Sequence, residues 1–594
     1  MIEDPTSRHL ALGAEPRLAE LNRAGVLDAA DVHVATRLGV LTEEASPDVR
    51  LAVALSVRAA RLGAVCVDLD ELPTPAELAE DPELTLTWPE QGPWVEAVRR
   101  STLTARGVLR LEGSLLYLDR HWREEKQVCD ELTRRLALRA PEIEELPLRA
   151  ALERMFPPGW EEQRNATERA TRQWTTVLTG GPGTGKTASV ARLLAVLSEQ
   201  HEASAGRPPR IALAAPTGKA AARLQESVAR ERDSGQMPPQ DVARLTGITA
   251  STVHRLLGWR PDNSTRFRHH RANPLPYDVV VVDEVSMVSL TQMTRLLEAV
   301  RPSTRLVLVG DPDQLASVEA GAVLADLVAG FENRADSPVV RLLITHRTSD
   351  DEGGRALDSL AAAMRQGKAD EAVELLRSSG DAVRLVDPDD LVAMAAVRAE
   401  MVTRAVEIAE AAQEAEALRA TELLEQHRLL CAHREGPYGV SGWNRQVVHH
   451  LAESAGVAHL DEWYAGRPVL ITANDRGLGL SNGDLGVTVR ADDGRLRVIV
   501  RVDGEPRSFA PTRLTGVETV YAMTVHKSQG SEARAVSVVL PPEDSPLLSR
   551  ELLYTAVTRA RQRVTVIGTE ESVRAAVRRK VQRASGLARR LQDS

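Results

Sequence analysis

Short runs of β-branched and apolar residues alternate with helix-like segments over most of the chain. The runs in the first half are TTVLT, RIALAA, DVVVVDE and RLVLVG, and those in the second half are RLLCA, VYAMTV, AVSVVL and RVTVIG. Strands this apolar, separated by amphipathic segments, are typical of parallel sheets that helices cover on both faces. The pattern predicts an α/β fold with two such layers in tandem.

Three regions depart from this alternation. Residues 1 to about 110 are rich in Ala, Leu, Arg and Glu at helical spacing, residues 385–427 are dominated by Ala and Glu, and VTVRADDGRLRVIVRVDGEPRSF alternates like antiparallel strands. A Pro- and Glu-rich stretch near residues 140–160 indicates a boundary. We therefore expect a helical amino-terminal domain over 1–120, an α/β domain over 145–350, and a second over 351–594 that holds a small β insertion at 484–516.

Composition and charge narrow the functional classes. Hydrophobic residues make up 43% and charged residues 27% of the chain, as in globular proteins. A formal charge of −10 argues against a protein that coats nucleic acid through overall basicity, although a local groove can still attract phosphate. Aromatic residues, at 3%, leave little for a base-stacking platform, so a bound strand would be held mainly by its backbone.

The sequence lacks the signatures of several other classes. The three cysteines, Cys66, Cys129 and Cys431, stand apart from one another, so neither a disulfide framework nor a zinc or iron–sulfur site has enough local ligands. The first residues lack the pattern of a signal peptide, and no run of about 18 apolar residues occurs. We expect a cytoplasmic protein with no membrane partner.

Lysine is rare and unevenly placed. Only six of the 74 basic residues are lysine, and three of these lie in the segments GGPGTGKT, APTGKAAARL and TVHKSQG. A compact ammonium and a planar guanidinium are not interchangeable at a tight phosphate site. The placement indicates that these three segments carry function.

The segment TTVLTGGPGTGKTASVARLL has the strand, glycine-rich loop and helix start of a P-loop. Glycines let backbone N–H groups face phosphates, Lys186 is expected to reach the β- and γ-phosphates, and Thr187 to ligate Mg²⁺. The sequence therefore predicts an ATP site whose loop consists of Gly180, Gly181, Pro182, Gly183, Thr184 and Gly185.

A pair of acidic residues ends the run DVVVVDE, well after the P-loop. Asp283 is expected to hold Mg²⁺ through water and Glu284 to polarise the attacking water, which predicts hydrolysis rather than binding alone. Taken by themselves, the two residues also suit an acidic turn after a buried strand. Arg347 and Arg559, across the presumed cleft, are candidates to stabilise charge on the γ-phosphate.

Taken in order, a series of segments resembles the motifs of superfamily 1B DNA helicases, and several resemble the RecD family, the alpha subunits of the RecBCD (exodeoxyribonuclease V) helicase–nuclease. The series covers roughly residues 160–570 and consists of GGPGTGKT, APTGKAAARL, STVHRLLG, VVVVDEVSM, LVLVGDPDQLASVEAG, THR, NGDLGV, AMTVHKSQGSE and LLYTAVTRAR. The resemblance implies two RecA-like motor domains, a small 1B element in the first, an SH3-like (2B) fold for the β insertion, and an amino-terminal domain that docks the motor into the complex.

The resemblance also assigns roles to single residues. Gln163 matches the glutamine that reads the adenine edge, and Gln314 the residue that senses the γ-phosphate. Arg347 and Arg559 match the arginine fingers. The residues in DNA-contact motifs are Pro216, Thr217, Lys219, Arg223 and His254 in the first motor domain, and Thr524, His526, Lys527 and Gln529 in the second. The alternative for these polar residues is loop capping and solvation.

The function that the resemblance implies is an ATP- and Mg²⁺-dependent DNA helicase that moves 5′ to 3′ and acts in recombinational repair. Its partners would be RecB- and RecC-type subunits, single-stranded DNA and duplex ends. We find no carboxylate cluster ending in lysine, so DNA cleavage is expected in a partner. Three alternatives stay open: a free-standing RecD-like helicase, a regulatory ATPase subunit with little unwinding of its own, and an RNA helicase of the same superfamily.

Overall fold

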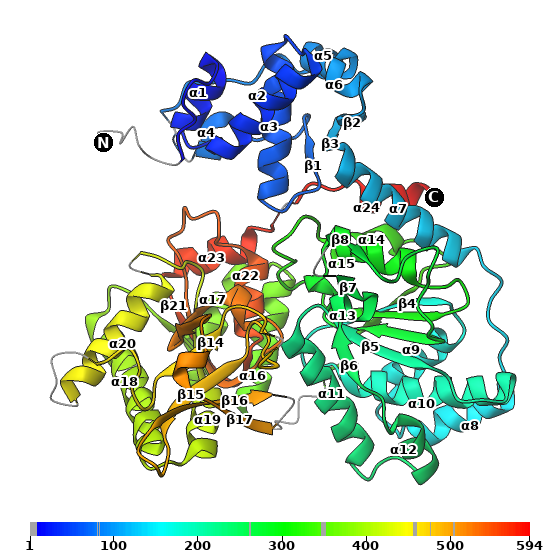
Figure 1. The fold of residues 1–594 in the computed structure, drawn as a ribbon, viewed down its shortest axis with the longest axis vertical. Helices are drawn as coiled ribbons and strands as arrows, with labels where there is room; N and C mark the ends of the chain where they lie inside the picture. Colours follow the sequence, from blue (N-terminus) through cyan, green and yellow to red (C-terminus); the bar gives the residue numbers. More distant parts are fainter. Residues whose placement is uncertain are drawn as a thin grey trace.

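The chain folds into an amino-terminal region that sits above two α/β layers lying side by side (Figure 1). The structure is a computed structural model, and it describes residues 9–79, 81, 83–260, 263–345, 352–436, 438–454, 460–475, 477–502, 505–581 and 583–594. None of the described helices combines the length and the apolar character needed to cross a membrane.

The amino-terminal region is helical, as predicted, and also contains a small sheet. Its antiparallel strands run in the order β1-β3-β2. Helix α3 begins where Ser46 accepts a hydrogen bond from Val49 N and Pro47 occupies the first turn, two favourable starts for a helix. The elements are α1 Pro16–Arg23, α2 Ala29–Thr42, α3 Pro47–Arg61, β1 Cys66–Asp68, α4 Pro75–Ala79, α5 Gln91–Arg100, α6 Thr102–Ala105, β2 Leu109–Glu112 and β3 Leu115–Leu118.

One long helix, α7 (Asp119–Leu136), leads from the amino-terminal region to the first α/β layer (Figure 1). Arg135, at its end, is only 2% exposed. Its guanidinium donates to Thr175 Oγ1 at 2.8 Å and to the carbonyls of Trp174 at 3.0 Å and Thr304 at 2.6 Å. Because a buried charge needs such partners, these bonds fix α7 to the sheet below it.

The first layer is a six-stranded sheet with the order β11-β4-β10-β9-β5-β6, and every pairing is parallel. All four valines of β9 are buried, as expected for a central strand covered on both faces. The prediction of a parallel sheet is confirmed. The elements are α8 Glu145–Met155, α9 Glu161–Thr171, β4 Thr175–Gly180, α10 Lys186–Ala205, β5 Ile211–Ala215, α11 Gly218–Asp233, α12 Pro239–Leu245, β6 Ala250–Thr252, α13 Val253–Leu257, β7 Trp259–Arg260, β8 Asn263–Phe267, β9 Val279–Val282, η1 Val285–Met287, α14 Leu290–Ala299, β10 Arg305–Gly310, α15 Val323–Phe331 and β11 Val339–Leu342.

The second layer is a five-stranded parallel sheet with the order β12-β21-β20-β13-β19. The helical prediction for residues 385–427 is confirmed for its main part by α18 and α19, while its two ends belong to β12 and β13. The elements are α16 Glu352–Arg365, α17 Ala369–Ser378, η2 Gly380–Ala382, β12 Val383–Val386, α18 Leu391–Gln413, α19 Ala417–Gln426, β13 His427–Cys431, α20 Val440–Ser454, β19 Ala522–Thr524, α21 Val525–Ser528, β20 Ala533–Val539, α22 Arg550–Val557, β21 Ala560–Ile567 and α23 Glu570–Arg578.

The alternating segment in the second half forms an antiparallel sheet of five strands with the order β17-β16-β15-β14-β18. Three of its strands, β15 Leu485–Arg490, β16 Leu496–Val502 and β17 Glu505–Phe509, lie within the range expected for the insertion. The other two, β14 Pro468–Ile471 and β18 Val517–Thr519, lie outside 484–516, so the sheet is larger than the alternation indicated. Its SH3-like character stays a prediction.

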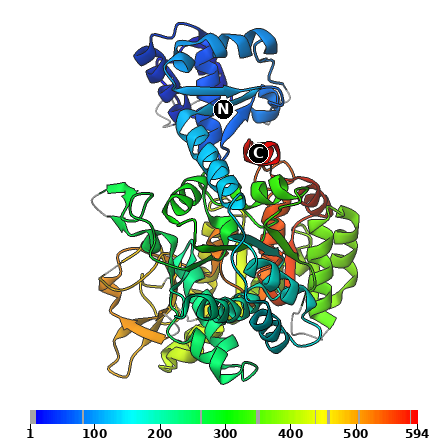
Figure 2. The same cartoon turned by 90° about the vertical axis from the view of Figure 1, so that its right-hand side faces the viewer.

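The end of the chain returns to the first layer. Helix α24 (Leu587–Asp593) packs against α15 and α7, on the side that faces the amino-terminal region (Figures 1 and 2). A Cβ on Gly330 would lie 2.8 Å from Leu591 Cβ, so α15 and α24 approach closely. Arg590 donates to Glu125 Oε1 in α7 at 2.8 Å. The last residues of the chain therefore tie α7 to the first layer.

Candidate functional site

The loop between β4 and α10 has the geometry of a phosphate cradle. Gly183 and Gly185 both have φ of +78°, a conformation that only glycine adopts without strain. Lys186, the first residue of α10, donates from Nζ to the carbonyls of Gly180 at 2.7 Å and Gly181 at 2.8 Å. The ammonium thus lies over the loop, at the amino end of a 20-residue helix, where anions are favoured.

Gln163 of α9 lies behind this loop and is completely buried. Its Nε2 donates to the carbonyl of Thr184 at 3.2 Å, and its Oε1 has no partner among the described residues. An unpaired buried acceptor costs about 1–3 kcal/mol, so this oxygen calls for a donor. The exocyclic amino group of adenine is such a donor, which fits the base-reading role expected for this residue.

Asp283 and Glu284 follow β9, beside the phosphate loop. Asp283 N donates to Ala214 O at 2.9 Å, Glu284 N donates to Asp283 Oδ1 at 2.8 Å, and Glu284 has φ of +52°. Burial raises the pKa of Asp283, the neighbouring Glu284 raises it further, and Lys186 opposes both. Two adjacent, half-buried carboxyl groups fit a divalent cation, whose charge would stabilise their ionised forms.

The loop after β10 joins the two layers through side chains. Gln314 Oε1 accepts a hydrogen bond from Arg559 Nη2 at 2.9 Å, and Gln314 Nε2 donates to Asp311 Oδ2 at 3.1 Å. Tyr554 of α22 donates from its hydroxyl to the same Asp311 oxygen at 3.0 Å. Gln314 and Arg559, both expected near the γ-phosphate, are therefore brought together by the fold.

Further bonds cross between the layers at the same place. Leu315 N donates to Thr555 Oγ1 at 2.8 Å, and Gln529 Nε2 donates to Leu315 O at 2.8 Å. Arg223 of α11 and Glu532 form an ion pair at 3.3 Å. Two of the residues expected to contact DNA, Arg223 and Gln529, thus contact the opposite layer in this structure.

Two threonines expected to contact DNA each cap a helix that follows a strand, one in each layer. Thr217 follows β5 and accepts a hydrogen bond from Ala220 N at 3.2 Å, which caps α11. Thr524 ends β19 and accepts from Lys527 N at 3.3 Å, which caps α21. Pro216 directly precedes Thr217. Capping is what the structure shows for both threonines, and their contact with DNA stays a prediction.

Lys219 and His254, two further residues expected to contact DNA, both belong to the first layer. Burial lowers the pKa of Lys219 to about 7, and the nearby Arg428 and Arg223 act in the same direction. His254 Nδ1 lies 3.0 Å from Gln292 Nε2, and burial lowers the pKa of this histidine. The two arginines near Lys219 favour binding of an anion, whereas the carboxylates of Glu425 and Asp484 act in the opposite direction.

Three predicted site residues remain. His526 and Lys527 belong to the second layer, and Arg347 is not among the described residues. Burial lowers the pKa of His526, and Arg583 adds to this effect. Lys527 donates from Nζ to Glu518 Oε2 at 2.7 Å, at the edge of the antiparallel sheet. Arg347 lies outside the described residues, so its position beside the nucleotide site stays a prediction.

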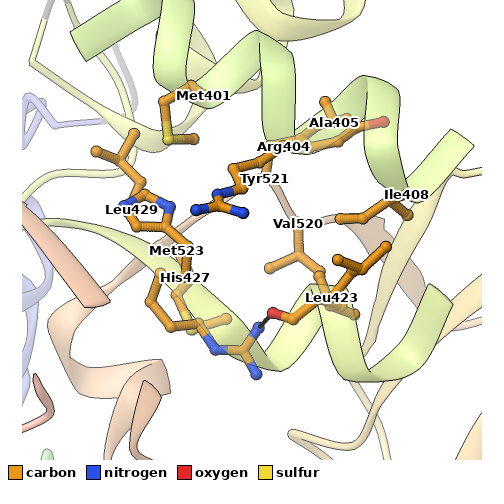
Figure 3. A pocket seen from close by; sticks show the side chains of 12 residues that line it. Met401, Arg404, Ala405, Ile408, Leu423, His427, Leu429, Val520, Tyr521 and Met523 are labelled. Carbon is orange, nitrogen blue, oxygen red and sulfur yellow. Dashed lines mark hydrogen bonds between the residues drawn. The ribbon is translucent and has the colours of Figure 1, made fainter. Parts of the chain in front are cut away.

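A pocket in the second layer is not part of this site. Figure 3 shows it between α18 and α19 on one side and β13 and β19 on the other, with Met401, Arg404 and His427 among the side chains around it. Its volume is about 30 Å³, which holds a water molecule and not a nucleotide.

Sequence reasoning missed three residues of the cleft: Asp311, Tyr554 and Thr555. Each lies inside a quoted motif, Asp311 in LVLVGDPDQLASVEAG and the other two in LLYTAVTRAR. Their partners are far away in the sequence, 243 residues for Tyr554 and Asp311 and 240 for Thr555 and Leu315. The motifs therefore include these three residues, but the sequence does not indicate what each side chain contacts.

Three family models match the chain. The N-terminal domain of RecBCD enzyme subunit RecD matches residues 23–117, an AAA domain matches residues 163–320, and the UvrD-like helicase C-terminal domain matches residues 519–567. Together these matches touch the amino-terminal region and both α/β layers.

Relatives of known family agree with these matches. The RecBCD enzyme subunit RecD of Mycolicibacterium smegmatis is 54% identical over 96% of this chain and 98% of that protein. The chain belongs to the RecD family. The RecBCD enzyme subunit RecD of Mycobacterium tuberculosis is 51% identical over 99% of both chains. The ATP-dependent RecD2 DNA helicase of Deinococcus radiodurans is 33% identical over 73% of this chain and 52% of that protein.

Membership of the RecD family and the AAA match establish the first layer as a nucleotide-binding domain. The match spans the glycine loop, the acidic pair Asp283 and Glu284, and the Gln314 loop. In this RecD-family chain, the nucleotide-binding layer and the layer with the UvrD-like match meet at Gln314 and Arg559.

Proposed function

We propose that this chain is the ATP-driven motor of a RecBCD-type helicase–nuclease and moves 5′ to 3′ along DNA during recombinational repair of DNA ends. The observation that carries the proposal is the bond between Gln314 and Arg559, because it couples the nucleotide-binding layer directly to the second layer. The names of the relatives support it, since they include RecBCD subunits and an ATP-dependent DNA helicase.

ATP is the substrate of the proposed reaction. Gln163 binds the adenine edge, the loop amides and Lys186 bind the phosphates, and Glu284 orients the water that attacks the γ-phosphorus. Thr187 and Asp283 would hold Mg²⁺, which supplies positive charge to the β- and γ-phosphates when bound. The protein's part is positioning and electrostatic stabilisation rather than covalent chemistry.

Motion follows from the contacts between the layers. Gln314 touches Asp311 on its own layer and Arg559 on the other, so a change at the nucleotide alters the bonds that hold the layers together. Two of the residues expected at the DNA groove, Arg223 and Gln529, contact the opposite layer. Opening and closing would therefore exchange contacts between the layers for contacts with the DNA backbone, which makes movement independent of sequence.

The domain organisation we propose is an amino-terminal docking domain over residues 1–120, a first motor domain over 145–350, and a second over 351–594 that includes the β insertion. RecB- and RecC-type subunits are the proposed partners. Exposed apolar side chains on α2 support a docking role, since Val34, Val40 and Leu41 are 41%, 64% and 56% exposed.

The proposal is tested by steady-state ATP hydrolysis with and without single-stranded DNA. Lys186→Ala removes the phosphate-binding ammonium and is expected to abolish turnover, whereas Lys126→Ala serves as a matched control. Lys126 is 48% exposed, lies on α7 and pairs only with Asp130 among the described residues. DNA-stimulated hydrolysis that survives Lys186→Ala, or a wild-type chain that does not hydrolyse ATP, would contradict the proposal.

A further inference from the structure

Arg365, the last residue of α16, brings a positive charge from the second layer to the phosphate loop of the first. A Cβ placed on Gly181 would lie 3.7 Å from Arg365 Nη1. The residue is half-buried and lies outside every helicase motif of the sequence. Arg365 therefore reaches the nucleotide site although no motif marks it.

Gly181 is approached from several directions. Its carbonyl accepts from Lys186 Nζ at 2.8 Å, and a Cβ placed on it would lie 3.2 Å from the hydroxyl of Tyr554. Two cations, one from each layer, thus lie beside one glycine of the phosphate loop. Like charges in a partly desolvated place repel one another, so the arrangement favours a negatively charged ligand between them.

The Arg365 guanidinium is not engaged by a hydrogen-bonding side chain or carbonyl in the part of the chain that the structure describes. Among the residues that the structure describes, its guanidinium takes part in no hydrogen bond or ion pair. The nearby Asp311 carboxylate is already used by Tyr554 and Gln314. Burial and Asp311 raise the pKa of Asp313 to about 6, and Arg365 lowers it without bonding to the carboxyl group. A half-buried guanidinium that makes no hydrogen bond within the described part of the chain has lost hydration that its electrostatic attraction to Asp313 only partly replaces, and a phosphate would supply the missing hydrogen bonds.

We propose that Arg365 is a phosphate-contacting residue of the ATPase site, whose guanidinium donates hydrogen bonds to the γ-phosphate of ATP when the two layers are closed. The proposal rests on the function proposed above and adds a residue from the second layer to it. Arg559 donates a hydrogen bond to Gln314, whereas Arg365 makes no hydrogen bond or ion pair with any described residue, so the two arginines have different roles.

The role of Arg365 is electrostatic. When water attacks the γ-phosphorus and the bond to the β–γ bridging oxygen breaks, negative charge accumulates on the oxygens of the phosphates. The guanidinium neither gives nor takes a proton, because it stays protonated throughout. Since Arg365 belongs to the second layer, its contact with the γ-phosphate also requires closure and ends when phosphate leaves.

The test compares Arg365→Ala and Arg365→Lys with wild type and with Arg377→Ala. Arg377 is a matched control because it lies on the neighbouring helix α17, is 57% exposed, and pairs with Glu570. The measurements are the kcat of DNA-stimulated ATP hydrolysis and the Kd of two probes, ADP and the non-hydrolysable analogue AMP-PNP. Melting temperatures show that each variant is folded.

Arg365→Ala is expected to lower kcat about 100-fold, as loss of one preorganised donor does. The same variant should raise the Kd for AMP-PNP about 10-fold and leave the Kd for ADP within about 2-fold of wild type, because only AMP-PNP carries the third phosphoryl group. Arg365→Lys should recover part of the AMP-PNP affinity but little of kcat, because lysine restores the positive charge without the planar guanidinium and its paired N–H donors. Arg377→Ala should behave as wild type.

A kcat within about 2-fold of wild type in Arg365→Ala, or equal weakening of ADP and AMP-PNP, would overturn the proposal. Lys186→Ala, measured alongside, separates this failure from failure of the proposed function. If wild type hydrolyses ATP, Lys186→Ala does not, and Arg365→Ala does, only the role of Arg365 is wrong. A wild-type chain without turnover overturns both.

Discussion

Arg559 of the second layer donates a hydrogen bond to Gln314 of the first layer at 2.9 Å. Both side chains are buried, at 4% and 7% exposure. Each also bonds within its own layer, Gln314 to Asp311 and Arg559 to the carbonyl of Thr555. The pair is therefore a direct link between the loop that follows β10 and the turn between α22 and β21.

Replacing Gln314 should uncouple ATP hydrolysis from DNA. Gln314→Ala removes both bonds of the amide but none of the groups that hold phosphate, so we expect DNA-stimulated kcat to fall about 10- to 100-fold with ATP affinity nearly unchanged. The measurement is ATPase rate against single-stranded DNA concentration. Gln240→Ala on the exposed part of α12 is the control. Full stimulation of Gln314→Ala by DNA would show that Gln314 has no part in coupling.

The end of the chain should contribute measurably to stability. Glu125 is fully buried and accepts from Arg590 Nε at 2.8 Å and from Gly586 N at 3.1 Å. Arg590→Ala leaves this carboxylate without its cation, which costs about 3 kcal/mol in such settings. We expect a lower free energy of unfolding in urea for Arg590→Ala than for Arg589→Ala, whose side chain on the same helix is exposed. Identical unfolding curves for the two variants would show that the pair between Arg590 and Glu125 does not stabilise the fold.

His427 should make stability depend on pH. It lies at the start of β13 with Nε2 3.0 Å from Ser537 Oγ, and burial lowers its pKa to about 3, with Arg404 and Arg563 acting in the same direction. The folded state thus keeps the ring neutral, whereas the unfolded chain takes up a proton below about pH 6.5. The stabilisation is fully present above that pH and is lost as the pH falls towards 3.

The pH prediction is tested with His427→Gln, which keeps a polar group beside Ser537 but does not titrate. Between pH 6.5 and 5.5, wild type is expected to lose up to about 1 kcal/mol more of its free energy of unfolding than the variant. The measurement is urea unfolding at the two pH values. Parallel losses in wild type and His427→Gln would mean that other groups account for the acid sensitivity.

Most of the fold could be predicted from the chain because its strands are locally marked. The four valines of β9 and the β-branched run of β21 are typical of buried parallel strands. The six-stranded and the five-stranded sheets that contain them are indeed parallel. The limits of the antiparallel sheet could not be predicted, since β14 and β18 are short strands that become part of it only by pairing across about 50 residues, as Val469 with Thr519 does. The return of α24 to the first layer likewise depends on tertiary packing.

The candidate site also has a part that could be predicted from the sequence and a part that could not. Loop geometry at Gly183, Gly185 and Lys186 is set by neighbouring residues, so the P-loop could be recognised from sequence alone. The partners across the cleft could not, because Tyr554 and Asp311 are brought together only when both layers are folded and in contact. Arg365 is the extreme case, since no motif surrounds it.

The measurement that tests the central claim most directly is ATP-dependent strand displacement on duplexes that carry either a 5′ or a 3′ single-stranded tail. The chain would be assayed alone and with RecB- and RecC-type subunits, with Lys186→Ala as the inactive control. The account predicts unwinding only from the 5′ tail, strengthened by the partners and absent in Lys186→Ala. Unwinding from the 3′ tail, or ATP hydrolysis without unwinding in either setting, would contradict it.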